Sequence, residues 1–169
     1  MATVPVDEAN EYFHRYIALA EDGTVEHALT HSKGQVLATL AQIDEDKAGY
    51  RYAAGKWSIK ELLQHIIDCE RIFLNRAVRI ARMDGTPMPG LDENDYASNS
   101  KADARPWADI VEEYELNRAS SLAFFKGLDD DQLKAKGTAN TVVLSVRAIG
   151  YLCAGHELHH NNVLCERYL

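Results

Sequence analysis

The chain has 169 residues, 46% of them hydrophobic, which suits one well-buried core, so we expect a single domain over residues 1–169. Its 26 acidic against 18 basic residues leave a formal charge of −8, which excludes a typical nucleic-acid-binding surface because phosphate contacts need a basic footprint. The sequence contains no apolar run of 18 residues and no signal peptide, which predicts a cytoplasmic protein that binds no membrane.

The spacing of apolar residues predicts helices along most of the chain, and little of it alternates as strands do. We expect a short N-terminal helix at about 7–20 and one additional helical turn at 129–133. The long helices should span about 24–43, 58–80, 105–125 and 145–169.

The second long helix has the clearest start. Ser58 followed by Glu61 fits a capping box, in which each residue satisfies a free backbone N–H of the other. Trp57 precedes the cap, where its side chain can pack across the first turn. We therefore place the beginning of this helix at Ser58.

Two stretches are expected to be irregular. Residues 84–96 form the longest of them, and loops of this length are often functional or mobile. Residues 137–140 should be a loop, and the β-branched stretch 141–144 could be a brief extended piece that is too short for a sheet. Side chains of the longer stretch could line the mouth of a pocket, namely Asp92, Glu93 and Asn94.

Four amphipathic helices with mostly short joins predict an all-α fold, an antiparallel four-helix bundle with a short extra N-terminal helix. Bundles of this kind build metal and ligand sites from side chains that face one another in the core. The position of each histidine on its helix is therefore informative.

The last helix carries His156, His159 and His160 on an otherwise apolar segment. At 100° per residue, His156 and His160 fall within roughly 30° of the middle of the apolar arc, and His159 lies about 90° away. Two imidazoles at i,i+4 spacing can meet one metal ion, and burying both without a shared partner is costly. We predict that His156 and His160 are metal ligands, with satisfied core histidines as the alternative.

A third ligand should come from another helix. His65 lies about 70° from the centre of the apolar arc of the second long helix, where a side chain can reach a neighbouring helix. With His156 and His160 it would supply three nitrogen ligands and leave one coordination position open, as in catalytic zinc sites. A half-exposed histidine at a helix interface is the alternative. The remaining histidines are expected at the surface, namely His14, His27 and His31.

The three cysteines, Cys69, Cys153 and Cys165, lie within apolar helical patterns. An odd number in a reducing compartment favours buried thiols over a disulfide. Cys69 and Cys153 each lie near a histidine on the same helix, which makes them weaker substitute ligands.

The stretch from His156 to His160 also matches H-E-x-x-H, the pattern of zinc proteases. Those enzymes take a third ligand from further along the chain. Only nine residues follow His160 here, and their one acid, Glu166, is too close to fold back onto the same ion. The protease is therefore disfavoured. Glu157 remains a candidate for acid–base catalysis or for supporting a ligand, with a solvated acid as the equally good alternative.

The sequence resembles the DinB-like (YfiT-like) superfamily of four-helix bundles over most of its length. The residues that carry the resemblance lie at 55–65, 68–71, 87–96, 145–148 and 154–160. In that superfamily a histidine of the second long helix joins an H-x-x-x-H pair of the last helix to hold one divalent metal. Those positions match His65, His156 and His160, the residues that helix geometry selects.

The resemblance implies several functions. Members include S-transferases that use bacillithiol, mycothiol or glutathione, a mycothiol-dependent isomerase, and proteins regarded as metal-dependent hydrolases. We expect a zinc- or nickel-dependent enzyme that transfers a low-molecular-weight thiol to a small electrophile, since an open coordination position suits a thiolate. A metal-dependent hydrolase and a non-catalytic metal-binding or stress-response module are the alternatives, and a bundle without a metal is the simplest one. The resemblance also implies a homodimer.

Overall fold

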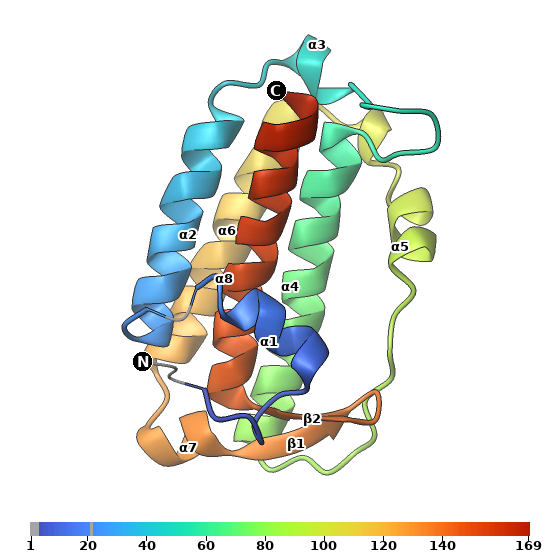
Figure 1. Ribbon diagram of the computed structural model, residues 1–169. Coiled ribbons are helices and arrows are strands. Elements are labelled where there is room, and N and C mark those ends of the chain that lie inside the picture. The colour runs from blue at the N-terminus through green and yellow to red at the C-terminus, as the bar shows by residue number, and fades with distance from the viewer. Residues whose placement is uncertain (1–3, 21) are drawn as a thin grey trace.

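The computed structural model describes residues 4–20 and 22–169. Four long helices form a bundle, which confirms the predicted fold (Figure 1). They are α2 (Val25–Leu40), α4 (Ile59–Ala81), α6 (Trp107–Lys126) and α8 (Val146–Val163), and one π-helical turn (Leu164–Tyr168) extends the last of them. The short elements are α1 (Glu11–Ile17), α3 (Glu45–Ala48), α5 (Glu93–Ser100), the 3-10 turn Ala102–Ala104, α7 (Asp130–Lys134), β1 (Lys136–Ala139) and β2 (Val142–Ser145).

The long helices run in two parallel pairs. α4 and α6 begin at the same end of the bundle, where Lys60 Nζ donates to the Arg105 carbonyl oxygen at 2.7 Å. Figure 1 shows the chain after α4 returning along the outside of the bundle through α5 before α6 begins. α2 and α8 run the opposite way, so the directions in chain order are up, down, down and up. α8 therefore packs antiparallel to α4, and their facing sides can hold a shared site.

Helix starts follow the capping residues of the sequence. The capping box of α4 is present, with Glu61 N donating to Ser58 Oγ at 3.0 Å and Ser58 N donating to Glu61 Oε2 at 2.9 Å. Ser145 caps α8 in the same manner, accepting from Ala148 N at 3.0 Å. Caps of this kind typically stabilise a helix by about 1 kcal/mol.

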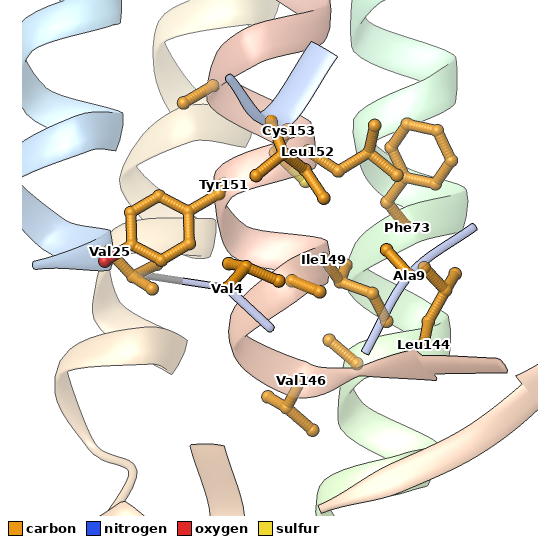
Figure 2. Packing of buried hydrophobic residues seen from close by; sticks show 14 of the residues in the cluster. Val4, Ala9, Val25, Phe73, Leu144, Val146, Ile149, Tyr151, Leu152 and Cys153 are labelled. Carbon is orange, nitrogen blue, oxygen red and sulfur yellow. The ribbon is translucent and has the colours of Figure 1, made fainter. Parts of the chain in front are cut away.

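Apolar side chains fill the space between the helices in two clusters. One lies at the end of the bundle where α1 and the strands pack on α8, and includes Phe73, Ile149 and Leu152 (Figure 2). The other lies at the opposite end and includes Ile66 and Ile110. Among the described residues, no helix has the length and apolar character needed to cross a membrane.

The prediction that residues 137–140 form a loop and that 141–144 are too short for a sheet was wrong. β1 and β2 form an antiparallel hairpin in which Lys136 pairs with Ser145 and Ala139 with Val142. Asn140 and Thr141 both have positive φ, 47° and 67°, which is the conformation that joins two strands through a two-residue turn. Thr141 is unusual there, and this explains why the sequence did not indicate a hairpin.

Part of the long segment 84–96 is helical, which also differs from the expectation. Asp92 Oδ1 accepts from Asn94 N and Asp95 N at 2.9 and 3.2 Å and so begins α5. This helix has one buried residue, Ala97, so the apolar periodicity that reveals a helix is absent.

α1 lies against α8 at unusually close range. A Cβ placed on Gly155 would lie 1.9 Å from the Tyr16 carbonyl oxygen, so only glycine allows this approach. Gly155 immediately precedes His156, and the contact therefore brings the aromatic residues of α1 to the predicted site.

Candidate metal centre

The three predicted ligands meet between α4 and α8. His156 Nε2 lies 3.3 Å from His65 Nε2 and 3.1 Å from His160 Nε2. The rings of His65 and His160 are themselves 4.8 Å apart between centroids. The i,i+4 spacing on α8 and the antiparallel packing of α4 thus place the Nε2 atoms of His65 and His160 on either side of His156 Nε2, within 3.3 and 3.1 Å of it.

This geometry fits a divalent metal ion. Two ligands of a tetrahedral zinc ion at about 2.0–2.1 Å stand roughly 3.3–3.4 Å apart, close to the observed separations. Hydrogen bonds alone satisfy the cluster less well, because a neutral imidazole Nε2 has one proton or one lone pair and His156 Nε2 faces two other nitrogens. The separations of His156 Nε2 from its two neighbours therefore suit lone pairs directed at a cation.

Burial keeps these histidines uncharged. It lowers the pKa of His65 to about 4 and that of His160 to about 3, where the neighbouring histidines add to the effect. The pKa of His156 lies well below its usual value for the same reasons. A neutral imidazole is the form that binds a metal, so the site is ready for an ion at neutral pH.

Cys69 is a fourth neighbour of the cluster. Its Sγ lies 3.6 Å from His65 Nδ1 and 3.7 Å from His65 Nε2, and the ligand atoms of His65, Cys69 and His156 all lie within 4.8 Å of one another. Burial raises the pKa of this thiol to about 12, with a smaller effect from Glu93. The group His65, Cys69 and His156 could hold a metal ion, so Cys69 competes with His160 for the third ligand position.

The other cysteines do not join this group. All three thiols are free, as predicted. Cys153 is buried, whereas Cys165 is exposed, so the expectation that Cys165 is buried was wrong. It lies on the terminal π-helical turn, where the faces of the helix are rotated relative to α8.

The remaining histidines divide into two groups. His27 and His31 are exposed, as predicted, whereas His14 is half-buried and its Nε2 is enclosed without a hydrogen-bond partner. The exposed position expected for His14 was wrong because α1 packs onto the bundle. His159 is half-buried, and its ring lies 5.0 Å from that of His160 and 5.2 Å from that of Tyr16. It is outside the ligand cluster but close to it.

Glu157 takes neither of its expected positions. It is fully buried and accepts hydrogen bonds from Arg118 Nη1 and Tyr114 Oη, both at 2.8 Å. Arg118 also binds both carboxylate oxygens of Glu70, at 2.8 and 2.9 Å, and donates to Ser32 and to the Leu29 carbonyl oxygen. Burial raises the pKa of Glu157 to about 7, against the opposing effect of Arg118. Glu157 therefore links α8 to α6 and is not solvated.

A cavity of about 490 Å³ opens beside the histidines, a size that suits a small molecule. α1 supplies one wall, including Phe13 and Tyr16, while Phe73 and Leu152 supply apolar surface from α4 and α8. Its other lining residues include Tyr12, Arg15, Trp57, Cys69, Arg76, Glu93, Asn140, His156, His159 and His160. Of the three loop residues expected at a pocket mouth, Glu93 lines this cavity, Asn94 lines a neighbouring one, and Asp92 caps α5.

The neighbouring cavity reaches the cluster from another side. It has a volume of about 260 Å³ and is lined by Trp57, His160 and Tyr168, among others. The Trp57 ring lies 4.7 Å from that of His65 and helps to bury it, which leaves His65 only 3% exposed. His65 is thus not the half-exposed interface residue of the alternative interpretation.

Two parts of the site did not emerge from the sequence. The wall formed by α1 depends on tertiary packing, and the available signal was a cluster of aromatic residues, Tyr12, Phe13 and Tyr16, on one short helix. The second part is Arg76. The sequence could have indicated it by its position on the face of α4 that carries His65 and Cys69.

Comparisons with known proteins agree with this structure. Residues 28–164 match the model of the DinB superfamily. A solved structure, that of YfiT from Bacillus subtilis, is similar with a TM-score of 0.73 and 14% sequence identity, over 96% of this chain and 90% of that chain. YfiT is described as a probable metal-dependent hydrolase with an unusual four-helix bundle topology. No curated protein matches the chain.

Proposed function

Because the chain belongs to the DinB superfamily, we propose that it is a metal-dependent enzyme that transfers a low-molecular-weight thiol to a small electrophile. His65, His156 and His160 would hold the ion, with zinc or nickel as the first candidates for nitrogen ligands. The observation that carries the proposal is the contact of His156 Nε2 with the Nε2 atoms of His65 and His160, where His156 and His160 line the cavity.

The acid–base groups around the cluster favour thiol transfer over hydrolysis. A divalent cation bound there would supply positive charge that stabilises a thiolate over a thiol. The candidate ligand group of His65, Cys69 and His156 contains no carboxylate, Glu157 is engaged by Arg118, and Glu93 is the carboxylate that lines the cavity. A thiolate is nucleophilic without a general base, whereas the attack of water usually needs one.

The transfer is a displacement at carbon. The thiolate sulfur forms a bond to the electrophilic carbon, and the bond from that carbon to its leaving group breaks. With a chlorinated aromatic substrate, chloride departs with the bonding pair, and the thiol proton passes to solvent. The chain would orient the electrophile against the apolar side chains of Phe13, Phe73 and Leu152, which line the cavity.

Hydrolysis is the second candidate, and His159 is the observation that favours it. This half-buried imidazole lines the cavity beside His160 and could accept a proton from attacking water. Burial lowers its pKa, which keeps it available as a base. A hydrolase would lose most turnover in the variant His159→Gln, whereas a thiol transferase would keep it. A metal-binding module would show turnover with neither class of substrate.

Elemental analysis tests the metal site directly. Protein prepared without a metal-affinity tag should contain about one divalent ion per chain, because the proposed ligands form a single mononuclear site. His156→Ala should lose it, and His31→Ala, an exposed histidine of α2, should retain it. Wild-type protein without stoichiometric metal, or equal uptake by both variants, would contradict the site.

Activity assays distinguish the reactions. Metal-loaded protein should conjugate one of several thiols to a chlorinated aromatic, and His156→Ala should not. Esterase or amidase activity that depends on His159 in place of conjugation would favour the hydrolase. No turnover in any assay by metal-loaded protein would favour the non-catalytic module.

We also propose that the protein is a homodimer, as the resemblance implies, and that it acts in the cytoplasm on a small molecule. Sedimentation velocity at micromolar concentration should show a species of about twice the chain mass of 18.9 kDa. A single species at the chain mass would contradict the dimer.

A further inference from the structure

Arg76 of α4 is a buried arginine without a carboxylate partner. The residue is 6% exposed, and its guanidinium donates from Nη2 to the Pro89 carbonyl oxygen at 2.8 Å. Within residues 4–20 and 22–169, no acid forms an ion pair with it. A guanidinium stays charged in proteins, and a buried charge without a partner is costly. The side chain therefore points to an anion that the chain itself does not supply.

Other arginines of the molecule show what Arg76 lacks. Arg118, which is fully buried, has the carboxylates of Glu70 and Glu157. Arg147, which is partly buried, has that of Glu8. Burial lowers the pKa of Arg76, the direction expected when a cation is removed from water.

Arg76 lines the cavity that contains the histidines. It follows His65 by 11 residues, which places it within about 20° of the same face of α4 and roughly 16 Å along the helix. Phe73 also lines this cavity. The centroid of its ring is 5.9 Å from the ring centroid of His156 and 5.9 Å from Arg76 Cζ. The same phenyl ring thus lies near both the guanidinium and an imidazole of the cluster.

We propose that Arg76 is the anion-binding residue of this cavity and that the substrate carries a carboxylate there, with its reacting atom at the histidine cluster. This inference names the substrate class of the proposed enzyme and rests on that function for the role of the histidines. A short apolar body would connect the two groups and pack on Phe73.

A carboxylate fits the charges better than a phosphate dianion does. One guanidinium balances one negative charge, and its planar N–H groups suit a carboxylate. Glu93 also lines the cavity and would repel a second negative charge. Arg15 is a less suitable anion site because it is exposed and lies over the rings of Tyr12 and Tyr16, 4.1 and 4.9 Å from their centroids.

The test compares an acid with its neutral analogue by calorimetry. 2-Naphthoate and 2-naphthamide have the same apolar body, so their affinity ratio reports the anion site. Wild-type protein should bind the acid at least about tenfold tighter than the amide, a difference within the range of one charged hydrogen-bonded pair. Arg76→Gln should bring the ratio near one without changing the affinity for the amide.

Two matched variants locate the effect. Arg15→Gln removes the other cation of the cavity and should change the ratio less than about threefold, because an exposed charge interacts weakly. Arg76→Lys keeps the charge without the planar guanidinium and should retain part of the preference for the acid. If circular dichroism shows that Arg76→Gln does not fold, Arg76→Lys takes its place in the test.

Metal-stripped protein separates this inference from the proposed function. A carboxylate could bind a metal ion directly, and its preference would then vanish on stripping and survive in Arg76→Gln, which would overturn the role of Arg76. A preference retained by stripped wild-type protein supports Arg76 even if the chain proves to bind no metal. Equal binding of acid and amide to wild-type protein, or no binding of either at millimolar concentration, also overturns the inference.

Discussion

Two groups of buried polar side chains lie on different sides of α8, and they differ in how completely they are satisfied. Glu157 faces α6, where Arg118 pairs with two carboxylates and with groups of α2. The preceding residue, His156, faces α4, where its Nε2 meets two further imidazole nitrogens and one tetrahedral position would remain open. The first group binds the bundle together through its own partners. The second would be completed by the cation that we propose.

The comparison shows how one buried segment can serve both stability and binding. A polar group inside a protein is tolerated when its hydrogen bonds are made, and each one that is not made by the chain requires a ligand or water. The Arg118 network joins four helices and so positions α8. The same network therefore also positions His156, because His156 is adjacent to Glu157 on α8.

The largest expected effect is on the satisfied group. Arg118→Met would leave Glu70 and Glu157 buried without their cation, which should reduce the free energy of unfolding by roughly 3–5 kcal/mol. Urea unfolding followed by circular dichroism measures it. The triple variant Glu70→Met, Arg118→Met, Glu157→Met removes all three charges and should be more stable than Arg118→Met alone. If the triple variant is the less stable one, the network does not act as a unit.

The next effect concerns the histidine group. At a free zinc concentration about 100 times the dissociation constant, wild-type protein should gain roughly 2.7 kcal/mol of stability, since a ligand that binds only the native state stabilises it. His156→Ala should gain nothing, and exposed His27→Ala should gain as much as wild type. Thermal unfolding with and without zinc gives the difference. An equal gain in His156→Ala would place the ion elsewhere.

A third test concerns the packing that brings α1 to His156. Gly155→Ala puts a methyl group against the Tyr16 carbonyl oxygen and should destabilise the fold by about 1–3 kcal/mol. Gly34→Ala makes the same change in the middle of α2, where nothing lies within 4 Å, and should stabilise by roughly 0.5–1 kcal/mol. Chemical denaturation of both variants measures the contrast. Similar changes of the same sign would show that α1 does not need glycine.

The smallest expected effect concerns Glu8, a buried carboxylate that belongs to neither group and pairs with Arg147. Although burial opposes it, hydrogen bonds from Arg147 and Ser145 hold the pKa of Glu8 below its usual value. The unfolded chain then takes up the proton first as pH falls, so this stabilisation is present above about pH 4.5 and disappears as pH falls through the folded pKa.

Glu8→Gln should therefore lose on the order of 1 kcal/mol at pH 7 and little at pH 3. Stability curves of the wild type and the variant across that range provide the measurement. A difference between them that stays constant with pH would show that the charge of Glu8 is not what stabilises the contact.

Much of the fold could be predicted because local signals agree with the tertiary structure. The capping box at Ser58 marks a helix start by its own hydrogen bonds, and the apolar spacing of α4 shows which side is buried. The hairpin at 136–145 could not be predicted in this way. Its turn uses Thr141 at positive φ, a conformation that the residue type disfavours.

The candidate site likewise has a part that local sequence predicted and a part that it did not. The spacing of His156 and His160 on one helix determined that their side chains share a face, since 100° per residue is a property of the backbone. The metal role of His65, His156 and His160 remains a prediction, and the structure adds Cys69 as a competing ligand.

Tertiary structure decided the partners of three residues. Glu157 was expected beside the metal or in solvent, and its actual partners come from α6, far along the chain. Arg76 became significant only when the absence of an acid in the described part of the chain could be seen. Tyr16 lies at the site because Gly155 of α8 allows α1 to pack closely against α8.

The sequence by itself determined the four long helices, the caps of α4 and α8 and the inward face of α8, because these depend on residues a few positions apart. Tertiary structure decided which buried polar groups are satisfied by the chain. A buried group is satisfied only when packing brings it a partner from a distant segment. Packing brings carboxylates to Arg118, whereas it brings only a carbonyl oxygen to Arg76.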